Sequence, residues 1–258
     1  LSAGWLYQRL DSRQVVNNLP LQDRDIEVSM PMLTIGYAGK GFDALNGRNF
    51  FSNTMLVNFA DQFGSSAEEE FNAQGSANAE GDFFIDRFQL ARFQRILPNV
   101  EGIGKWSLYM KVDGQFSSAP LVPQLRKSVG GADSVRGYQE QELAGDDAVV
   151  ASLELRAPVW DNFCPCLKQS EEYLEENPDA WQQHRLQLLV FSDFGYIHLR
   201  DPLPGEQDTN AIWSVGAGLR LSVTKYSQLR FDLGIPLEET EDTNSADARG
   251  HFSFQLQF

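Results

Sequence analysis

The stretch SVGGADSVRGYQEQELAGDDAVVASLELRAPVW, residues 128–160, joins a polar, glycine-rich segment to a run of alternating residues. In its first half a single arginine, Arg136, stands between Val135 and Gly137. In its second half the apolar residues at 149, 151, 153, 155 and 157 alternate with a second set: Val150, Ser152, Glu154 and Arg156. Because successive side chains of a β-strand point to opposite faces, this alternation predicts a strand over 147–159 with one apolar and one largely polar face.

The same period of two recurs along the chain, between stretches rich in turn residues. It predicts ten strands, over residues 2–10, 25–37, 52–61, 82–96, 104–116, 147–159, 184–198, 210–223, 226–236 and 248–258. Strands of globular proteins average about 5–6 residues, whereas a tilted strand that crosses a membrane needs about 9–11, and most of these segments have that length or more. No run of about 18 apolar residues exists, which excludes transmembrane helices. The sequence therefore predicts an all-β fold, an antiparallel transmembrane β-barrel.

The faces of individual strands favour the same fold. In residues 185–197 an apolar set is expected to face lipid: Leu186, Leu188, Val190, Phe194 and Tyr196. Asp193 lies on the opposite, inward face with Arg185, Gln187 and Gly195. The last strand places Phe252, Phe254, Leu256 and Phe258 on one face, which is unusual for a soluble protein, whose chain termini fray. A sandwich with one solvated face is the alternative, but the long strands and the alternation of shorter and longer links favour a barrel.

Composition excludes several functional classes. The 258 residues carry a net charge of −15, a poor match to nucleic acid, and the acidic clusters are interpreted as solvated loops. Cys164 and Cys166 are too close together, and lack the partner ligands, for a zinc site, so a loop disulfide or two free thiols is expected. We expect no cofactor, no metal and no enzymatic activity. Ser134 has no His–Asp set, because His184, His198 and His251 lie on or near separate strands.

Three further segments have modest interpretations. Asp146 and Asp147 are expected to form a turn, and the glycines of 36–47 a loop without phosphate-binding spacing. Residues 166–184 predict a short surface helix, either a binding site for a partner or a solvated decoration. The chain starts without a secretory signal peptide, which suggests a processed or truncated chain, or the ordered part of a longer one.

Several motifs together resemble a known family. Val135, Arg136, Gly137 and Tyr138 match a V-R-G-[FY] tetrapeptide, and Phe191, Asp193 and Gly195 match a downstream F-x-D-x-G. The segment IWSVGAGLRLSV, residues 212–223, is similar to a G-x-G-L-R strand, and Phe258 is a terminal aromatic in the right place. In this order the motifs resemble the two-partner secretion transporters of the haemolysin-activator type, within the outer-membrane assembly and secretion superfamily.

The resemblance implies a specific architecture. Family members have a 16-stranded barrel in the bacterial outer membrane, preceded by periplasmic polypeptide-transport domains. Residues 1–258 would be the C-terminal part of such a barrel, 117–146 the signature loop folded into the lumen, and 160–183 a surface loop insertion. Five predicted strands follow the signature loop, as in the family, but only about five precede it where about eleven are expected. Either the chain is a fragment or other material completes the barrel.

The resemblance also implies roles for the matched residues. It pairs Arg136 with Asp193 on the barrel wall, while Gly195 leaves room for the loop tip and Phe258 is the signal for assembly. A loop tether without any part in transport is the plainer interpretation of the arginine–aspartate pair.

The function implied is export of a partner polypeptide through the outer membrane. The alternatives are a barrel that assembles other outer-membrane proteins, a passive pore, and the anchor barrel of a fused autotransporter passenger. Expected partners are the secreted polypeptide client, the barrel-assembly machinery during biogenesis, and outer-membrane lipid with lipopolysaccharide. No nucleic acid is expected among them.

Overall fold

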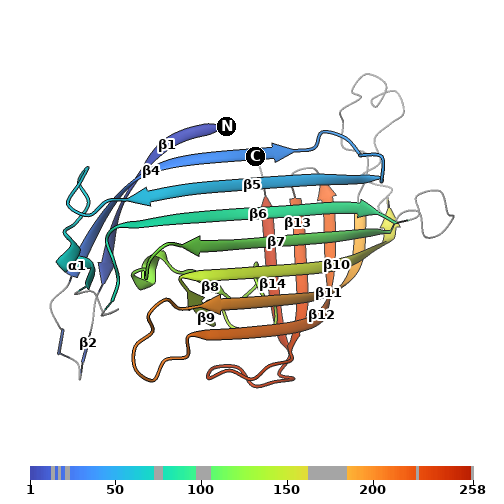
Figure 1. The fold of residues 1–258 in the computed structure, drawn as a ribbon. Coiled ribbons are helices and arrows are strands. Elements are labelled where there is room, and N and C mark those ends of the chain that lie inside the picture. The colour runs from blue at the N-terminus through green and yellow to red at the C-terminus, as the bar shows by residue number, and fades with distance from the viewer. Residues whose placement is uncertain are drawn as a thin grey trace.

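The computed structural model describes residues 1–12, 15–16, 19–20, 24–72, 78–96, 106–161, 185–224 and 227–256. Within these ranges the chain forms one antiparallel sheet of ten strands, in the order β1-β4-β5-β6-β7-β10-β11-β12-β13-β14 (Figure 1). Each strand is paired with its neighbours along the chain, so the sheet is a meander. A single large sheet, rather than two packed layers, agrees with the predicted barrel wall and not with a sandwich.

All ten predicted strands are present. Their bounds are β1 (Ser2–Ser12), β4 (Arg24–Ala38), β5 (Gly47–Asn58), β6 (Phe83–Arg95), β7 (Ser107–Ser117), β10 (Asp147–Asp161), β11 (Arg185–His198), β12 (Thr209–Thr224), β13 (Ser227–Pro236) and β14 (Arg249–Leu256). The largest error is at β5, predicted over 52–61. Its polar start at 47–49 has the composition of a loop, but pairing with residues 92–94 of β6 extends the strand over these residues.

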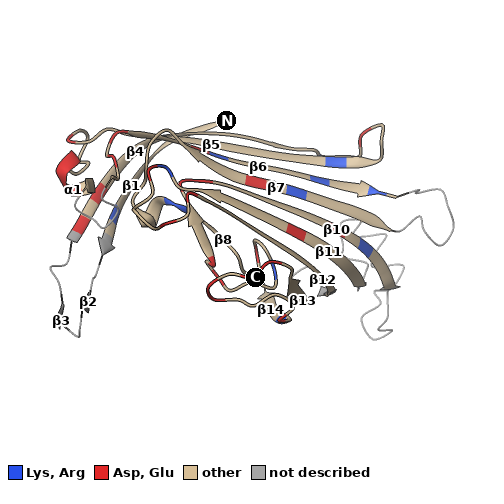
Figure 2. Ribbon diagram, turned by 60° about the horizontal axis from the view of Figure 1, so that its bottom comes forward, with Lys and Arg blue, Asp and Glu red and all other residues tan. Residues whose placement is uncertain are grey.

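The sheet curls, so that it has a concave inner face and a convex outer face (Figures 1 and 2). Of the residues of β11 predicted to face outward, Leu188, Val190, Phe194 and Tyr196 are exposed and Leu186 is half-buried, while Asp193 on the inner face is completely buried. On β14 the outward residues Phe252, Phe254 and Leu256 are likewise exposed. The apolar outer face and the polar inner face expected of a barrel wall are therefore both present.

The segment that connects β7 to β10 lies inside the curve of the sheet (Figure 2). It contains a short 3-10 helix, η1 (Pro123–Leu125), and a hairpin of β8 (Lys127–Val129) and β9 (Leu143–Gly145). We call residues 118–146 the signature loop, because Ser117 still belongs to β7 and the predicted start at 117 was one residue early.

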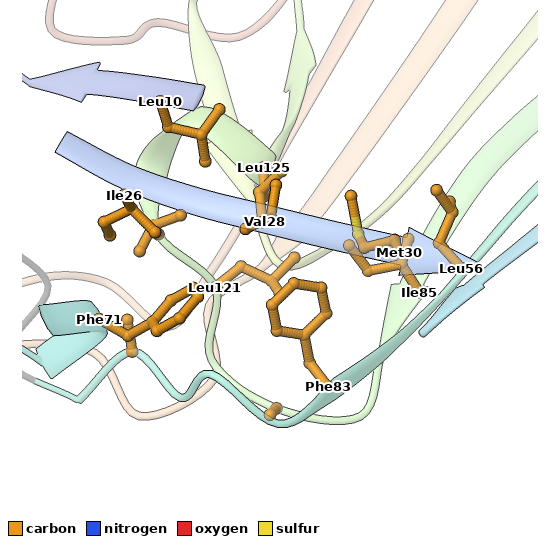
Figure 3. Packing of buried hydrophobic residues seen from close by; sticks show 13 residues of the cluster. Leu10, Ile26, Val28, Met30, Leu56, Phe71, Phe83, Ile85, Leu121 and Leu125 are labelled. Carbon is orange, nitrogen blue, oxygen red and sulfur yellow. The ribbon is translucent and has the colours of Figure 1, made fainter. Parts of the chain in front are cut away.

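A buried apolar cluster fixes the first part of the signature loop. Leu121 and Leu125 pack against residues of β4, β5 and β6, and against Phe71 of the short helix α1 (Glu68–Asn72) (Figure 3). A second cluster fixes the rest of the loop. It consists of Val129, Val135, Tyr138, Ala148, Val150, Ile197, Leu199 and Ile212, so it joins the loop to β10, β11 and β12. Apolar burial on the inner face thus holds the loop there from end to end.

The structure also describes two short strands outside the large sheet, and several predictions concern residues that it does not describe. β2 (Val15–Val16) and β3 (Leu19–Pro20) form a small hairpin between β1 and β4. Trp160 and Asp161 belong to β10, and the rest of the loop predicted at 160–183 lies outside the described residues. The predicted helix at 166–184, Cys164, Cys166, His184 and Phe258 lie outside the described residues. In the part of the chain that is described, no helix is long and apolar enough to span a membrane.

Candidate functional site

The tip of the signature loop is a tight turn built on glycine. Gly130, Gly131 and Gly137 have positive φ angles of 111°, 100° and 98°, which residues with a Cβ rarely adopt. The turn closes with hydrogen bonds from the Gly131 amide to the Val135 carbonyl and from the Gly130 amide to the Ser134 hydroxyl. This backbone presents Arg136 toward the sheet, because it turns the chain back immediately before and after that residue.

Arg136 binds Asp193 in a fork. Its Nε lies 2.6 Å from Asp193 Oδ2 and its Nη2 lies 2.8 Å from Oδ1, while the Arg136 amide donates to Oδ2 at 3.2 Å. The arginine side chain is 2% exposed and the aspartate side chain 0%. Bidentate, charge-assisted hydrogen bonds of this kind are the strongest that proteins form, so the contact fixes both the position and the orientation of the loop tip.

Two residues of β10 complete the shell around the guanidinium. Nη1 of Arg136 donates to Glu154 Oε1 at 2.6 Å, and Nη2 donates to the Ser152 hydroxyl at 3.1 Å. Ser152 in turn donates to Asp193 Oδ1 at 2.6 Å. Because Nε, Nη1 and Nη2 all have partners, the buried cation does not carry the penalty of an unsatisfied charge.

The motif F-x-D-x-G on β11 has a physical explanation at each position. The Arg136 guanidinium carbon lies 3.5 Å from the centre of the Phe191 ring, within range of a cation–π interaction. Gly195 lies on the same inner face. A Cβ there would collide with the Val129 side chain and lie 2.8 Å from Cγ2 of Val135. Phe191, Asp193 and Gly195 therefore form the wall on which the loop tip rests.

A larger ionic network surrounds the pair, and the sequence did not predict it. Glu154 also binds Arg156 at 2.5 Å, and Asp232 of β13 binds both Arg220 at 2.7 Å and Arg230 at 2.5 Å. Arg136 Nη1 lies 3.6 Å from Asp232. The signal available in the sequence was alternation, which places Glu154, Arg220 and Asp232 on inner faces. It does not indicate which inner-face residues of distant strands meet.

The carboxylates keep the arginine charged. Burial of the Arg136 side chain lowers its pKa, but Asp193, Glu154 and Asp232 raise it more, and the net change is upward from its ordinary value. The guanidinium is therefore a permanent cation in this site, and pH does not switch the contact through it.

Tyr138 and Gly137 make contacts of their own. The Tyr138 side chain is fully buried. Its hydroxyl lies 3.0 Å from the carbonyls of Trp213 and Glu238 and accepts the Glu238 amide at 3.0 Å. The Gly137 amide donates to His251 Nε2 at 3.1 Å. Each residue of the V-R-G-Y tetrapeptide thus has a separate contact, since Val135 belongs to the second apolar cluster.

The acidic pair Asp146–Asp147 anchors the base of the loop. Asp146 is completely buried and accepts the amides of Leu121 and Arg200 at 2.9 and 2.8 Å. Asp147 is the first residue of β10 and accepts the Ser117 amide at 2.8 Å. Across the described ranges, no group of three or more His, Cys, Asp or Glu side chains is arranged to hold a metal ion.

Comparison with known proteins identifies the family. The family model described as haemolysin secretion/activation protein ShlB/FhaC/HecB matches residues 7–221. The chain belongs to the ShlB/FhaC/HecB family. Members of this family are outer-membrane β-barrel transporters of the two-partner secretion type, so the resemblance, the fold class and the outer-membrane location predicted from the sequence are all confirmed.

Solved structures agree with the fold that this family implies. CdiB from Escherichia coli superposes with a TM-score of 0.64 at 16% sequence identity, over 93% of this chain and 38% of that one. CdiB from Acinetobacter baumannii matches at a TM-score of 0.46 and 16% identity, over 98% of this chain and 47% of that one, a similarity too low to add to the argument. This chain thus spans less than half the length of either protein. No curated protein matches it in sequence.

Proposed function

We propose that this chain forms part of the translocation pore through which a two-partner secretion transporter exports its partner polypeptide. The observation that carries the proposal is the arginine lock, by which we mean the contact of Arg136 with Asp193, Glu154 and Ser152 on the inner face of the sheet. A loop held inside a barrel occupies the path that a client would take. The lock fixes where the loop lies in that path, and so sets the conformation in which the barrel passes its client.

The inner surface beside the lock suits an extended polypeptide. A cavity of about 490 Å³ adjoins the loop tip. It is lined mainly by charged and polar side chains of both signs, among them Lys111, Asp133, Glu154, Arg156, Arg220 and Arg230. A wall with mixed charges can exchange hydrogen bonds with a passing backbone without binding one sequence tightly, because no large apolar patch retains it.

The proposal also assigns the rest of the chain and its partners. Residues 1–258 would be the C-terminal part of the barrel, with residues 118–146 as its inward loop. The apolar outer face would contact lipid and lipopolysaccharide, and Phe258 would be read by the barrel-assembly machinery. The client is a secreted polypeptide of the same two-partner system.

A secretion assay tests the proposal. Arg136→Ala in the full-length transporter is expected to reduce secreted client at least tenfold, while the amount of heat-modifiable barrel in the outer membrane stays the same. Lys111→Ala is the matched control, because it removes another inner-face cation of the same cavity, and Lys127 still pairs Asp113 at 2.6 Å. Secretion at the normal level by Arg136→Ala, with Lys111→Ala also normal, would defeat the proposed role of the lock.

A further inference from the structure

The signature loop has a second set of contacts, distinct from the arginine lock. Arg230 of β13 donates to the Asp133 carboxylate at 2.9 Å and to the Ala132 carbonyl. Gln139 Nε2 donates to the Asp242 carbonyl at 2.9 Å, and Glu142 accepts the Thr243 hydroxyl at 2.9 Å. Both partners lie in residues 237–248, which connect β13 to β14. Residues 132–142 of the loop are therefore bound to the last described hairpin, and the loop is not held by β10 and β11 alone.

Two glycines let the loop tip touch β13 directly. A Cβ at Gly137 would lie 2.9 Å from the Gly234 carbonyl carbon, and a Cβ at Gly234 would lie 2.5 Å from the Gly137 nitrogen. Both clashes are with backbone atoms, which cannot move aside as a flexible side chain can. The main chains of loop and strand lie so close here that neither position has room for a Cβ, and both require glycine.

The loop tip also contacts β14 through His251. The Gly137 amide donates to His251 Nε2 at 3.1 Å, which requires a neutral imidazole with its proton on Nδ1. His251 is on the inner face of β14, opposite to the exposed Phe252 and Phe254. Within the described part of the chain, β14 pairs only with β13 and is an edge of the sheet.

We propose that the signature loop braces the β13–β14 hairpin, and that His251 is the positioning residue through which the loop tip holds β14. The arginine lock binds the loop tip to β10 and β11. The second set of contacts, which we call the brace, binds the loop to β13, to β14 and to residues 237–248 between them. Arg136 belongs to the lock and the adjacent Gly137 to the brace, so the two sets of contacts meet at the loop tip. Withdrawal of the tip from the inner face therefore releases β14 at the same moment as it clears the lumen. The position of β14 and the position of the loop are coupled by this geometry.

Hydrogen exchange in the full-length transporter, in detergent micelles and without client, tests the brace. His251→Phe keeps a ring but removes the acceptor, while His251→Gln keeps an acceptor on a side chain of similar reach. The loss of one hydrogen bond is expected to speed amide exchange in residues 249–256 and 130–142 about fivefold in His251→Phe, which corresponds to about 1 kcal/mol. His251→Gln is expected to stay within twofold of the unmodified protein. Equal acceleration in both variants, or none in His251→Phe, would overturn the proposal.

A second pair of variants tests the brace independently of the histidine. Gly234→Ala is expected to speed exchange in the loop and in β14 together, because its Cβ pushes the loop tip off β13. Gly250→Ala is its control on the neighbouring strand, since a Cβ there meets only the Phe231 ring at 3.7 Å. Ser253→Ala, two residues beyond His251 on the same face, controls for changes within β14 itself. Acceleration by Gly234→Ala in the loop alone would contradict the coupling. Since no client is present, these outcomes do not depend on whether the chain secretes one.

Discussion

Arg136 and Asp193, 57 residues apart in the chain, meet through two side-chain hydrogen bonds of 2.6 and 2.8 Å in a site where both side chains are buried. The contact joins the tip of the signature loop to the inner wall of the sheet. Because Glu154 shares the same guanidinium, the pair is the centre of a network and not an isolated bridge.

Replacing the arginine by lysine is expected to weaken the lock in spite of the conserved charge. A lysine ammonium is a point charge and cannot bind Asp193 in a fork while also reaching Glu154. Arg136→Lys should lower the free energy of unfolding in detergent micelles by about half as much as Arg136→Ala, for which removal of one partner of a buried pair costs about 3–5 kcal/mol. Urea titration measures both. Equal stability of Arg136→Lys and the unmodified protein would show that the fork contributes nothing.

Exchanging the two charges is expected not to restore the lock. A carboxylate at position 136 would lie beside Glu154 and Asp232, which are already buried acids. Like charges at this distance repel, so the double variant Arg136→Asp with Asp193→Arg should secrete no more client than either single variant. The measurement is the amount of secreted client for all three. Recovery to near the normal level would mean that Asp193 is the only partner that matters.

A side chain at Gly195 is expected to displace the loop tip. In Gly195→Ala the new methyl group collides with Val129 and Val135, both buried in the second apolar cluster. Protection of residues 130–138 from exchange should fall while β10 and β11 stay protected. Gly36→Ala, whose Cβ would meet only the Phe51 carbonyl at 3.8 Å, is the control and should change nothing. An unchanged loop in Gly195→Ala would show that the tip does not rest on this wall.

The burial of Leu121 in the first apolar cluster predicts a loss of stability when this side chain is shortened. Leu121 is completely buried against β4, β5 and β6, so Leu121→Ala should cost about 2–5 kcal/mol and loosen residues 118–126. Leu188→Ala on the outer face, where the side chain is 49% exposed, should cost clearly less. Urea titration of the two variants compares the costs. Similar losses would mean that the inner cluster is no better packed than the outer face of the sheet.

The strands and one partner of Arg136 could be predicted from the sequence. Alternation of side chains is a local property, and it predicted all ten strands and the inward direction of Asp193. The contact of Arg136 with Asp193 followed from that direction together with the resemblance to the family, and the structure contains it.

The rest of the site depends on which distant residues the curled sheet brings together. Glu154 is 18 residues from Arg136 and His251 is 114 residues from Gly137, and no local pattern links these positions. The burial of Leu121 and Phe71 was missed for the same reason, since an apolar residue in a loop shows no period that indicates what covers it.

The most direct test of the central claim, that the signature loop is held on the inner wall by Arg136 and Asp193, is a double-mutant cycle. Arg136→Ala, Asp193→Ala and the double variant are unfolded with urea in detergent micelles, and the free energies of unfolding are compared. We predict a coupling of about 2–3 kcal/mol, so that the double variant loses much less than the sum of the single losses. Losses that add within about 0.5 kcal/mol would show that the two residues do not interact, and would contradict the account.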